Sequence, residues 1–133
     1  MLFRSVDGSA QTVLLSEVRC GSVLSPGDAR GTWALGFPAC SALAGTVIEQ
    51  MRGPNQTGAG DDNVQYCVDA PNDGMGCFIL KNSTTQGQAR GQHIGGINVT
   101  FCDASTRFVR NDVPAPVWFR MTSAADGKVW VYD

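Results

Sequence analysis

The residues of this 133-residue chain that could do chemistry are a single histidine, five cysteines and a pair of adjacent aspartates. His93 could serve as the general base for a Ser or Cys nucleophile. The sequence has no GxSxG elbow, however, and nothing in it pairs a nucleophile with this histidine. We therefore expect His93 to be a turn residue whose ring nitrogens hold a loop, and a hydrolase that uses His93 ranks last among the possible functions.

The adjacent acids Asp61 and Asp62, with Asn63, lie in a Gly-rich stretch and offer the oxygen ligands that Ca²⁺ prefers. Carbonyl oxygens of Gly58 or Gly60 could complete such a site. The spacing is not that of an EF-hand, and adjacent acids in a Gly-rich loop are usually solvated turn residues. An ordinary surface loop is therefore the main expectation, and calcium is the alternative. No other cofactor is expected, because P-loop and dinucleotide fingerprints are absent.

The five cysteines stand at positions 20, 40, 67, 77 and 102. No CxxC pair is present, and one histidine cannot complete a zinc-ligand set at zinc-finger intervals. In an exported domain this composition predicts one or two disulfides. Cys67 and Cys77 are the best local pair, because they bracket a loop of Pro, Asn, Asp and Gly. Cys102 is expected to be a buried free thiol on a strand.

A β-hairpin is expected near the only histidine. Ile97, Val99 and Phe101 alternate with more polar residues, which is the period-two pattern of a strand with one buried face. The triplet Asp-Ala-Ser at 103–105 is a turn signal, and residues 106–110 then return to β-type residues. His93 stands at the entrance to this hairpin, ten positions before its turn begins.

The stretch 91–110, GQHIGGINVTFCDASTRFVR, closely resembles the C-terminal signature of a bacterial family of prepilin-like proteins, which reads roughly HxGGxNVxFxDGSxRF. The matching positions are His93, Gly95, Gly96, Asn98, Val99, Phe101, Asp103, Ser105, Arg107 and Phe108. Ala104 stands where the family has Gly. If the turn holds this position at positive φ, alanine costs roughly 1 kcal/mol relative to glycine.

Three earlier blocks are also similar to this family and follow in its order. Residues 7–12, DGSAQT, with the apolar run to Arg19, resemble the family's DGTSNT segment and the strand after it. Residues 30–36, RGTWALG, are similar to its RGxWAxG block. Residues 53–55, GPN, with the acids at 61–62, are similar to its cysteine-bearing loop. The resemblance spans residues 7–130 and leaves residues 1–6 outside.

Proteins of this family begin with a basic leader, a cleavage site and a long apolar helix that anchors the subunit. Residues 1–6, MLFRSV, contain no leader, and the uncharged run 31–48 is interrupted by Pro38, so it is not a membrane span. We therefore expect this chain to be the C-terminal head of a longer protein, with the N-terminal pilin helix of that protein missing from it. The resemblance implies a location in the cell envelope or outside the cell.

The function that the resemblance implies is structural and non-enzymatic. The head would belong to a pilin-like or pseudopilin-like subunit of a cell-surface or secretion-type assembly, with other pilin-like subunits or envelope proteins as partners. The alternative is an extracellular binding module for glycans or Ca²⁺. Nucleic acid is not an expected partner, because the net charge is −2 and no basic run is present.

Length and composition favour one domain over residues 1–133. We expect an α+β fold with an antiparallel sheet and a short C-terminal helix, and the resemblance implies that it is similar to the head of a pseudopilin-like protein. The 16 glycines and the low charged fraction of 17% indicate a loop-rich, β-leaning chain. Strands are predicted at 12–19, with Val13, Leu15 and Val18 facing inward, at 32–36, at 78–80 and at 128–132. Residues 39–50 could form a short helix or an irregular apolar segment.

Asp112 is predicted to cap a helix over 113–122, whose apolar face would consist of Val117, Trp118 and Met121. The three tryptophans at 33, 118 and 130 either form a sugar-stacking platform or pack in the core, and packing is the commoner use of such residues.

Overall fold

The computed structural model describes residues 6–21, 27–45, 52–58, 61–79 and 85–131. It confirms a small, loop-rich α+β fold with a short C-terminal helix. The elements in chain order are β1 (Val13–Ser16), β2 (Ala44–Gly45), β3 (Asp62–Asn63), the 3₁₀ turn η2 (Pro71–Asp73), β4 (Cys77–Phe78), β5 (Gln86–Gly87), β6 (Gly96–Phe101), β7 (Thr106–Arg110) and α1 (Ala115–Thr122). None of the helices in these ranges is long and apolar enough to span a membrane.

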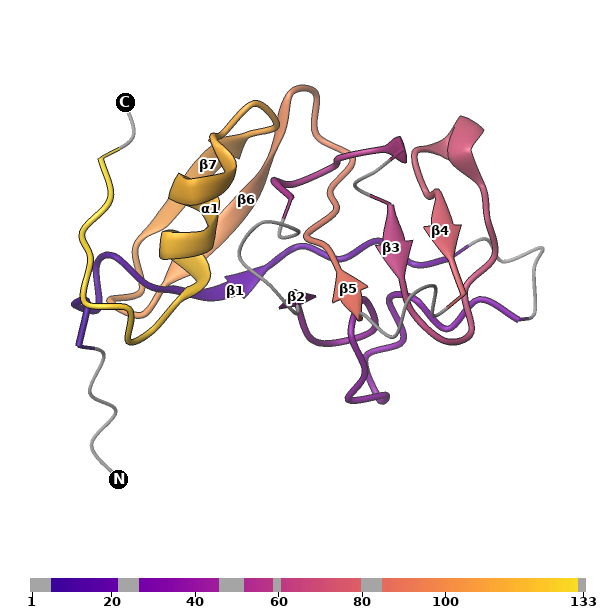
Figure 1. The fold of residues 1–133 in the computed structure, drawn as a ribbon, viewed down its shortest axis with the longest axis horizontal. Coiled ribbons are helices and arrows are strands. Elements are labelled where there is room, and N and C mark those ends of the chain that lie inside the picture. Colours follow the sequence, from indigo (N-terminus) through magenta and orange to yellow (C-terminus); the bar gives the residue numbers. More distant parts are fainter. Residues whose placement is uncertain (1–5, 22–26, 46–51, 59–60, 80–84, 132–133) are drawn as a thin grey trace.

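Two separate sheets form the described structure (Figure 1). One sheet has three long strands in the order β1-β6-β7, and we call it the larger sheet because it contains more residues. It is antiparallel throughout, as the sequence predicts. The smaller has the order β2-β5-β3-β4 and is mixed, because β3 and β4 run parallel. Strands of only two residues supply few ladder bonds, so side-chain contacts must hold the smaller sheet together.

The main core lies between the larger sheet and α1, which lies across that sheet in Figure 1. The predicted alternation along β6 is confirmed: Ile97, Val99 and Phe101 are fully buried, whereas the residues between them are half-buried. Trp118 and Met121 of α1 are buried against this strand, and Val117 packs at the edge of the cluster. The predicted helix face is therefore confirmed.

The prediction that Leu15 faces inward is wrong, since 63% of this residue is exposed. The pairing of β1 with β6 shifts register between Val13 and Leu15. An irregularity of this kind changes the face to which the following side chain points. Leu14 is also exposed, at 56%, and β1 is shorter than the predicted strand.

The predicted strand at 32–36 is also wrong. Gly31 has a φ of 72°, and a Cβ there would lie 2.5 Å from the Cα of Cys20. A turn follows, in which the amide of Leu35 donates to the carbonyl of Thr32 at 3.1 Å. The chain therefore reverses where an extended strand was expected, and Trp33 is left 87% exposed.

The C-terminal part differs from the prediction at two points. Asp112 does not cap α1: Pro114 occupies the N-cap position with no side-chain bond, and Asp112 pairs with Arg110 instead. Residues 128–131 form no strand, so that prediction is wrong over the described range, and Tyr132 lies outside it. This segment is fixed by Trp130, whose indole Nε1 donates to the carbonyl of Gln11 at 2.7 Å.

Two further predictions are met in part. The undecided segment 39–50 contains β2, and its residues 46–50 lie outside the described structure. The strand expected at 78–80 is present as β4, one residue earlier, while Leu80 is not described.

Candidate functional site

His93 lies in the loop that leads into β6 and meets two side chains from elsewhere in the fold. Its Nε2 atom is 2.9 Å from Oε1 of Glu17, which directly follows β1. The Nδ2 group of Asn98 on β6 donates to the same carboxylate oxygen at 3.0 Å and lies 2.9 Å from the His93 Nε2. The three groups therefore tie the entry loop of the hairpin to both β1 and β6.

Main-chain contacts place Glu17 in this cluster. The amide of Arg90 donates to the carbonyl of Glu17 at 2.9 Å, so the two segments run side by side. The two segments are close at Gly91, where a Cβ would lie 2.2 Å from the Oε2 of Glu17, so a side chain there would displace this carboxylate. That Oε2 atom is buried without a hydrogen-bond partner. The imidazole of His93 is 54% exposed and forms the open side of the cluster.

Two hollows flank the loop that carries His93, with volumes of about 400 and 500 Å³. Both are bordered by Arg19, Gly91, Gln92 and His93. The first also includes Cys20, an exposed free thiol. Its Sγ atom, however, is 3.6 Å from the carbonyl oxygen of Gly31, toward which it is directed. Among the described hydrogen bonds none joins this thiol to the imidazole, so the geometry does not form a Cys-His pair.

The other motif residues build the hairpin itself. One carboxylate oxygen of Asp103 accepts the amide of Ser105 at 2.9 Å and its hydroxyl at 2.6 Å. These bonds with Ser105, helped by the positive charge of Arg107, lower the pKa of Asp103 below its ordinary value. Ala104 between them has a φ of 67°, which is the conformation that favours the glycine of the family pattern.

The two glycines and the Arg-Phe pair of the motif also have packing roles. Gly95 turns the chain at a φ of 84°. A Cβ on Gly96 would lie 2.2 Å from the carbonyl oxygen of Val109 and 2.7 Å from the ring of Phe108, so only glycine fits under this ring. The guanidinium carbon of Arg107 lies 4.9 Å from the centroid of the Phe101 ring, a cation–π contact.

A buried ionic network is centred on Asp62 of β3, and the hydrophobic pattern of the sequence gave no indication of it. Asp62 is fully buried, and its Oδ2 accepts Nη1 of Arg30 and Nε of Arg90, both at 3.0 Å. Its Oδ1 accepts the amide of Gln88 at 3.0 Å. Arg30 also pairs with Asp28 at 2.7 Å. Hydrophobic patterns treat arginine as a surface residue; the position of Arg30 in the RGTWALG block was the available signal.

The calcium candidates do not form an open ligand set in the described structure. The carboxylate of Asp62 is occupied by two arginines, and Gly60 lies outside the described residues. Asp61 is buried beside it with an unpartnered Oδ1, and burial raises the pKa of this carboxyl group above its ordinary value. Asn63 is buried on β3. Across the described ranges, no three His, Cys, Asp or Glu side chains gather as a metal site would need.

The predicted disulfide between Cys67 and Cys77 is confirmed, with a Cα–Cα distance of 6.4 Å. It closes the loop that contains η2 and joins this loop to β4. Cys102 is a half-buried free thiol directly after β6, where burial raises its pKa. Both disulfide sulfurs belong to a small second core with Ala39 and Val64.

Comparison with known families identifies the chain. The family model described as a protein of unknown function (DUF1559) matches residues 1–115, so this chain belongs to that family. The matched range includes all four sequence blocks, the cluster around His93 and residues 1–6. No curated protein and no solved structure matches the chain.

Proposed function

We propose that this chain is the head of a structural, non-enzymatic pilin-like or pseudopilin-like subunit in a cell-surface or secretion-type assembly. The supporting observation is how the motif residues are used. Each motif side chain for which a contact is described above meets a group of the protein itself: Asp103 its own turn, Asn98 the Glu17 carboxylate, and Arg107 the buried rings. A motif used in this way specifies a scaffold.

The contacts between distant blocks support the same proposal. Arg30 of the RGTWALG block binds Asp62 of the acidic loop, and Asp62 binds Arg90, which leads into the hairpin. Thr12 of the first block is buried, and its carbonyl accepts the amide of Cys102 in the hairpin block at 2.9 Å. The blocks that resemble the prepilin-like family are therefore joined through the interior, which is the behaviour of a fold signature.

The disulfide favours an oxidising compartment, since such bonds persist mainly outside the cytosol. The proposed location is therefore the cell envelope or the extracellular space. Other pilin-like subunits or envelope proteins are the proposed partners. Loops such as 52–58 and 64–76 are available for contacts with them.

A binding module is the second candidate, and the hollows beside His93 are the observation that favours it. Its calcium form finds less support, because arginines occupy the carboxylate of Asp62. Its glycan form would rest on Trp33 alone among the tryptophans, since Trp118 and Trp130 are buried. A hydrolase finds the least support, because the thiol of Cys20 is directed at the carbonyl of Gly31.

The test is to sequence the DNA upstream of Met1 in frame and to identify the N-terminus of the native protein by mass spectrometry. A leader, a processing site and a retained apolar helix would support the assembly subunit. A mature protein that begins at Met1 would contradict it. A cleaved signal peptide with no retained helix would favour the binding module.

A further inference from the structure

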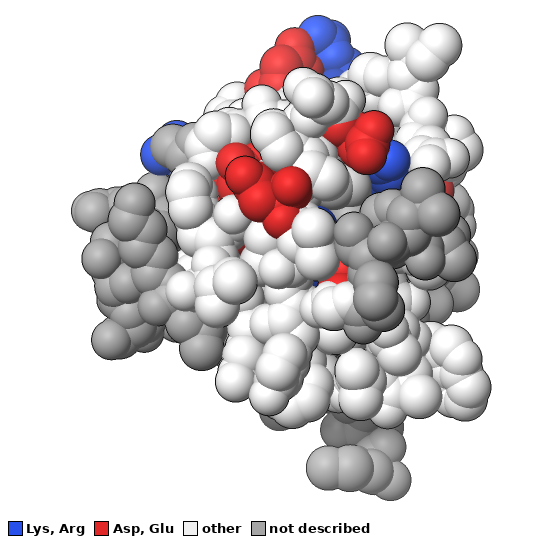
Figure 2. Space-filling model, turned by 90° about the vertical axis from the view of Figure 1, so that its right-hand side faces the viewer, with Lys and Arg blue, Asp and Glu red and all other residues white. Residues whose placement is uncertain are grey.

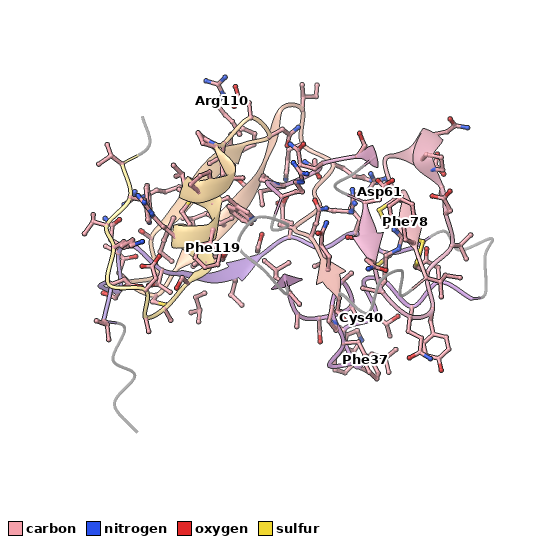
Figure 3. The ribbon with its side chains drawn as sticks, in the orientation of Figure 1. Phe37, Cys40, Asp61, Phe78, Arg110 and Phe119 are labelled. Carbon is pink, nitrogen blue, oxygen red and sulfur yellow. A yellow bond between two sulfur atoms is a disulfide. The ribbon has the colours of Figure 1, made fainter. Side chains whose placement is uncertain are left out.

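An apolar loop projects from the end of the molecule that carries the smaller sheet. Trp33 is 87% exposed and Phe37 is 55% exposed, and Phe37 lies at the lower edge of the molecule in Figure 3. The sequence has no charged residue from Gly31 to Gly45. In Figure 2, turned about the vertical axis, the visible acidic and basic residues lie in the upper and middle parts of the face, above a broad uncharged region.

Hydrogen bonds fix the shape of this apolar loop (residues 33–37). The hydroxyl of Ser41 donates to the carbonyl of Leu35 at 2.6 Å, and the amide of Cys40 donates to the carbonyl of Phe37 at 3.0 Å. Ala39, two residues after Phe37, is buried with a φ of 62°. The two aromatic side chains are therefore held out toward solvent by an ordered turn, which reduces the entropy cost of burying them in a partner.

A groove of about 640 Å³ lies next to this loop on the same chain, between β1, residues 41–44 and the C-terminal half of α1. Leu14 and Leu15 form one wall, and both are more than half exposed. Phe119 of α1 borders the other side and is labelled in Figure 3. The lining contains no charged residue. Its chemistry therefore matches that of the apolar loop.

We propose that two copies of this chain form a dimer in which the apolar loop of each copy enters the groove of the other. The area favours reciprocal insertion. An aromatic side chain buries roughly 150–250 Å², so Trp33 and Phe37 at their exposures would bury roughly 300 Å² together and a similar area of groove. One insertion thus buries roughly 600 Å², which is the size of a crystal contact, whereas two bury roughly 1,200 Å², the lower limit of specific interfaces.

Sedimentation velocity on the purified chain, from about 1 to 500 µM, tests this proposal. We expect the mass to rise from 14.1 kDa to twice that value with concentration. Trp33→Ser and Leu15→Asp should each weaken the dimer at least about 10-fold. Ile94→Ser is the matched control, because Ile94 is fully exposed on a different loop and should leave the dimer unchanged. Circular dichroism establishes that each variant is folded.

A charge-swap variant tests whether Trp33 of one copy contacts Leu15 of the other. With Leu15→Asp present, Trp33→Lys should restore part of the dimer, because the lysine of one copy then meets the aspartate in the groove of the other. Iodide quenching gives a second readout, since Trp33 is the exposed tryptophan and should become protected as the dimer forms.

A monomer at every concentration would overturn the proposal, as would a dimer that survives either single variant. Growth beyond two copies would overturn the reciprocal arrangement. None of these results bears on the assembly proposal, which depends on the native N-terminus.

Discussion

Replacing Ala104 with glycine should stabilise the protein, because this residue occupies the turn of the β6–β7 hairpin at a φ of 67°. The left-handed conformation costs a residue with a Cβ about 1 to 2 kcal/mol. Glycine removes that cost but gains about 0.4 to 1 kcal/mol of conformational freedom in the unfolded chain. The net expectation is an increase of about 0.5 to 1 kcal/mol in the free energy of unfolding.

The assay is thermal and urea denaturation followed by circular dichroism. An unfolding entropy of about 2.1 cal/mol/K per residue gives roughly 0.28 kcal/mol/K for 133 residues, so Tm should rise by about 2 to 4 °C. Ala125→Gly is the matched control, since Ala125 is also exposed but is not among the positive-φ residues. There glycine should lower the stability.

Two results would refute this reasoning. If Ala104→Gly lowers Tm as much as Ala125→Gly does, the turn does not hold position 104 at positive φ. If Ala39→Gly gives the larger gain, relief of φ strain is not what chiefly stabilises these glycine variants. Ala39 has a similar φ of 62° but is buried, so glycine there also loses methyl packing and should gain less.

The remaining predictions concern the region of the smaller sheet. Cys67→Ser should lower the free energy of unfolding by about 2 to 3 kcal/mol, measured in urea, and a reductant should then have no further effect. Asp62→Ala should lower the free energy of unfolding by about 3 to 5 kcal/mol in the same assay, because it leaves two buried arginines without their shared carboxylate. A surface change such as Asp73→Ala is the control and should lower it by under about 0.5 kcal/mol. Asp61→Asn should raise Tm at pH 7 but not at pH 3. Burial raises the pKa of this carboxyl group in the folded protein above 3.8, so ionising it destabilises the fold as the pH rises above 3.8. This destabilisation is absent below pH 3.8, where the group is protonated in both states. An equal effect at both pH values would contradict this assignment.

The hairpin and the helix face could be predicted because their signals are local. The period-two run ending at Phe101, the Asp-Ala-Ser turn and the spacing of Trp118 and Met121 all act within a few residues, and the structure contains each feature. The period-two argument fails for Leu15, because the register shift between β1 and β6 depends on the partner strand and not on the local sequence. Thr32 and Trp33 favour a strand, but the tight approach of Gly31 to Cys20 turns the chain.

The buried network could not be predicted from the sequence because its members are far apart. Arg30, Asp62 and Arg90 are separated by 32 and 28 residues, and each lies in a segment that reads as a polar loop. Glu17 and His93 are separated by 76 residues, and their pairing follows only from the contact of the segment after β1 with residues 90–91. The local sequence is compatible with either exposure or burial of such residues, and the long-range topology decides between the two.

The position of the network bears on how the two halves of the molecule stay together. The main core is built by β6, β7 and α1, whereas the smaller sheet has a core of four small residues and strands two residues long. Hydrophobic burial alone would hold the smaller sheet weakly. Arg90 connects the two halves, because its guanidinium binds Asp62 of β3 and the carbonyl of Gly74, while its amide bonds to Glu17 beside the hairpin.

A buried ion pair adds little net stability over an apolar replacement, but its geometry admits one arrangement of its partners. In this protein that arrangement fixes the loops around the smaller sheet, including the apolar loop at 33–37, relative to the hairpin. Arg30, which precedes that loop, and Arg90, which precedes the hairpin, share one carboxylate oxygen of Asp62. The shared carboxylate therefore sets the position of the apolar loop relative to the hairpin, as we propose for a subunit that contacts its neighbours through both surfaces.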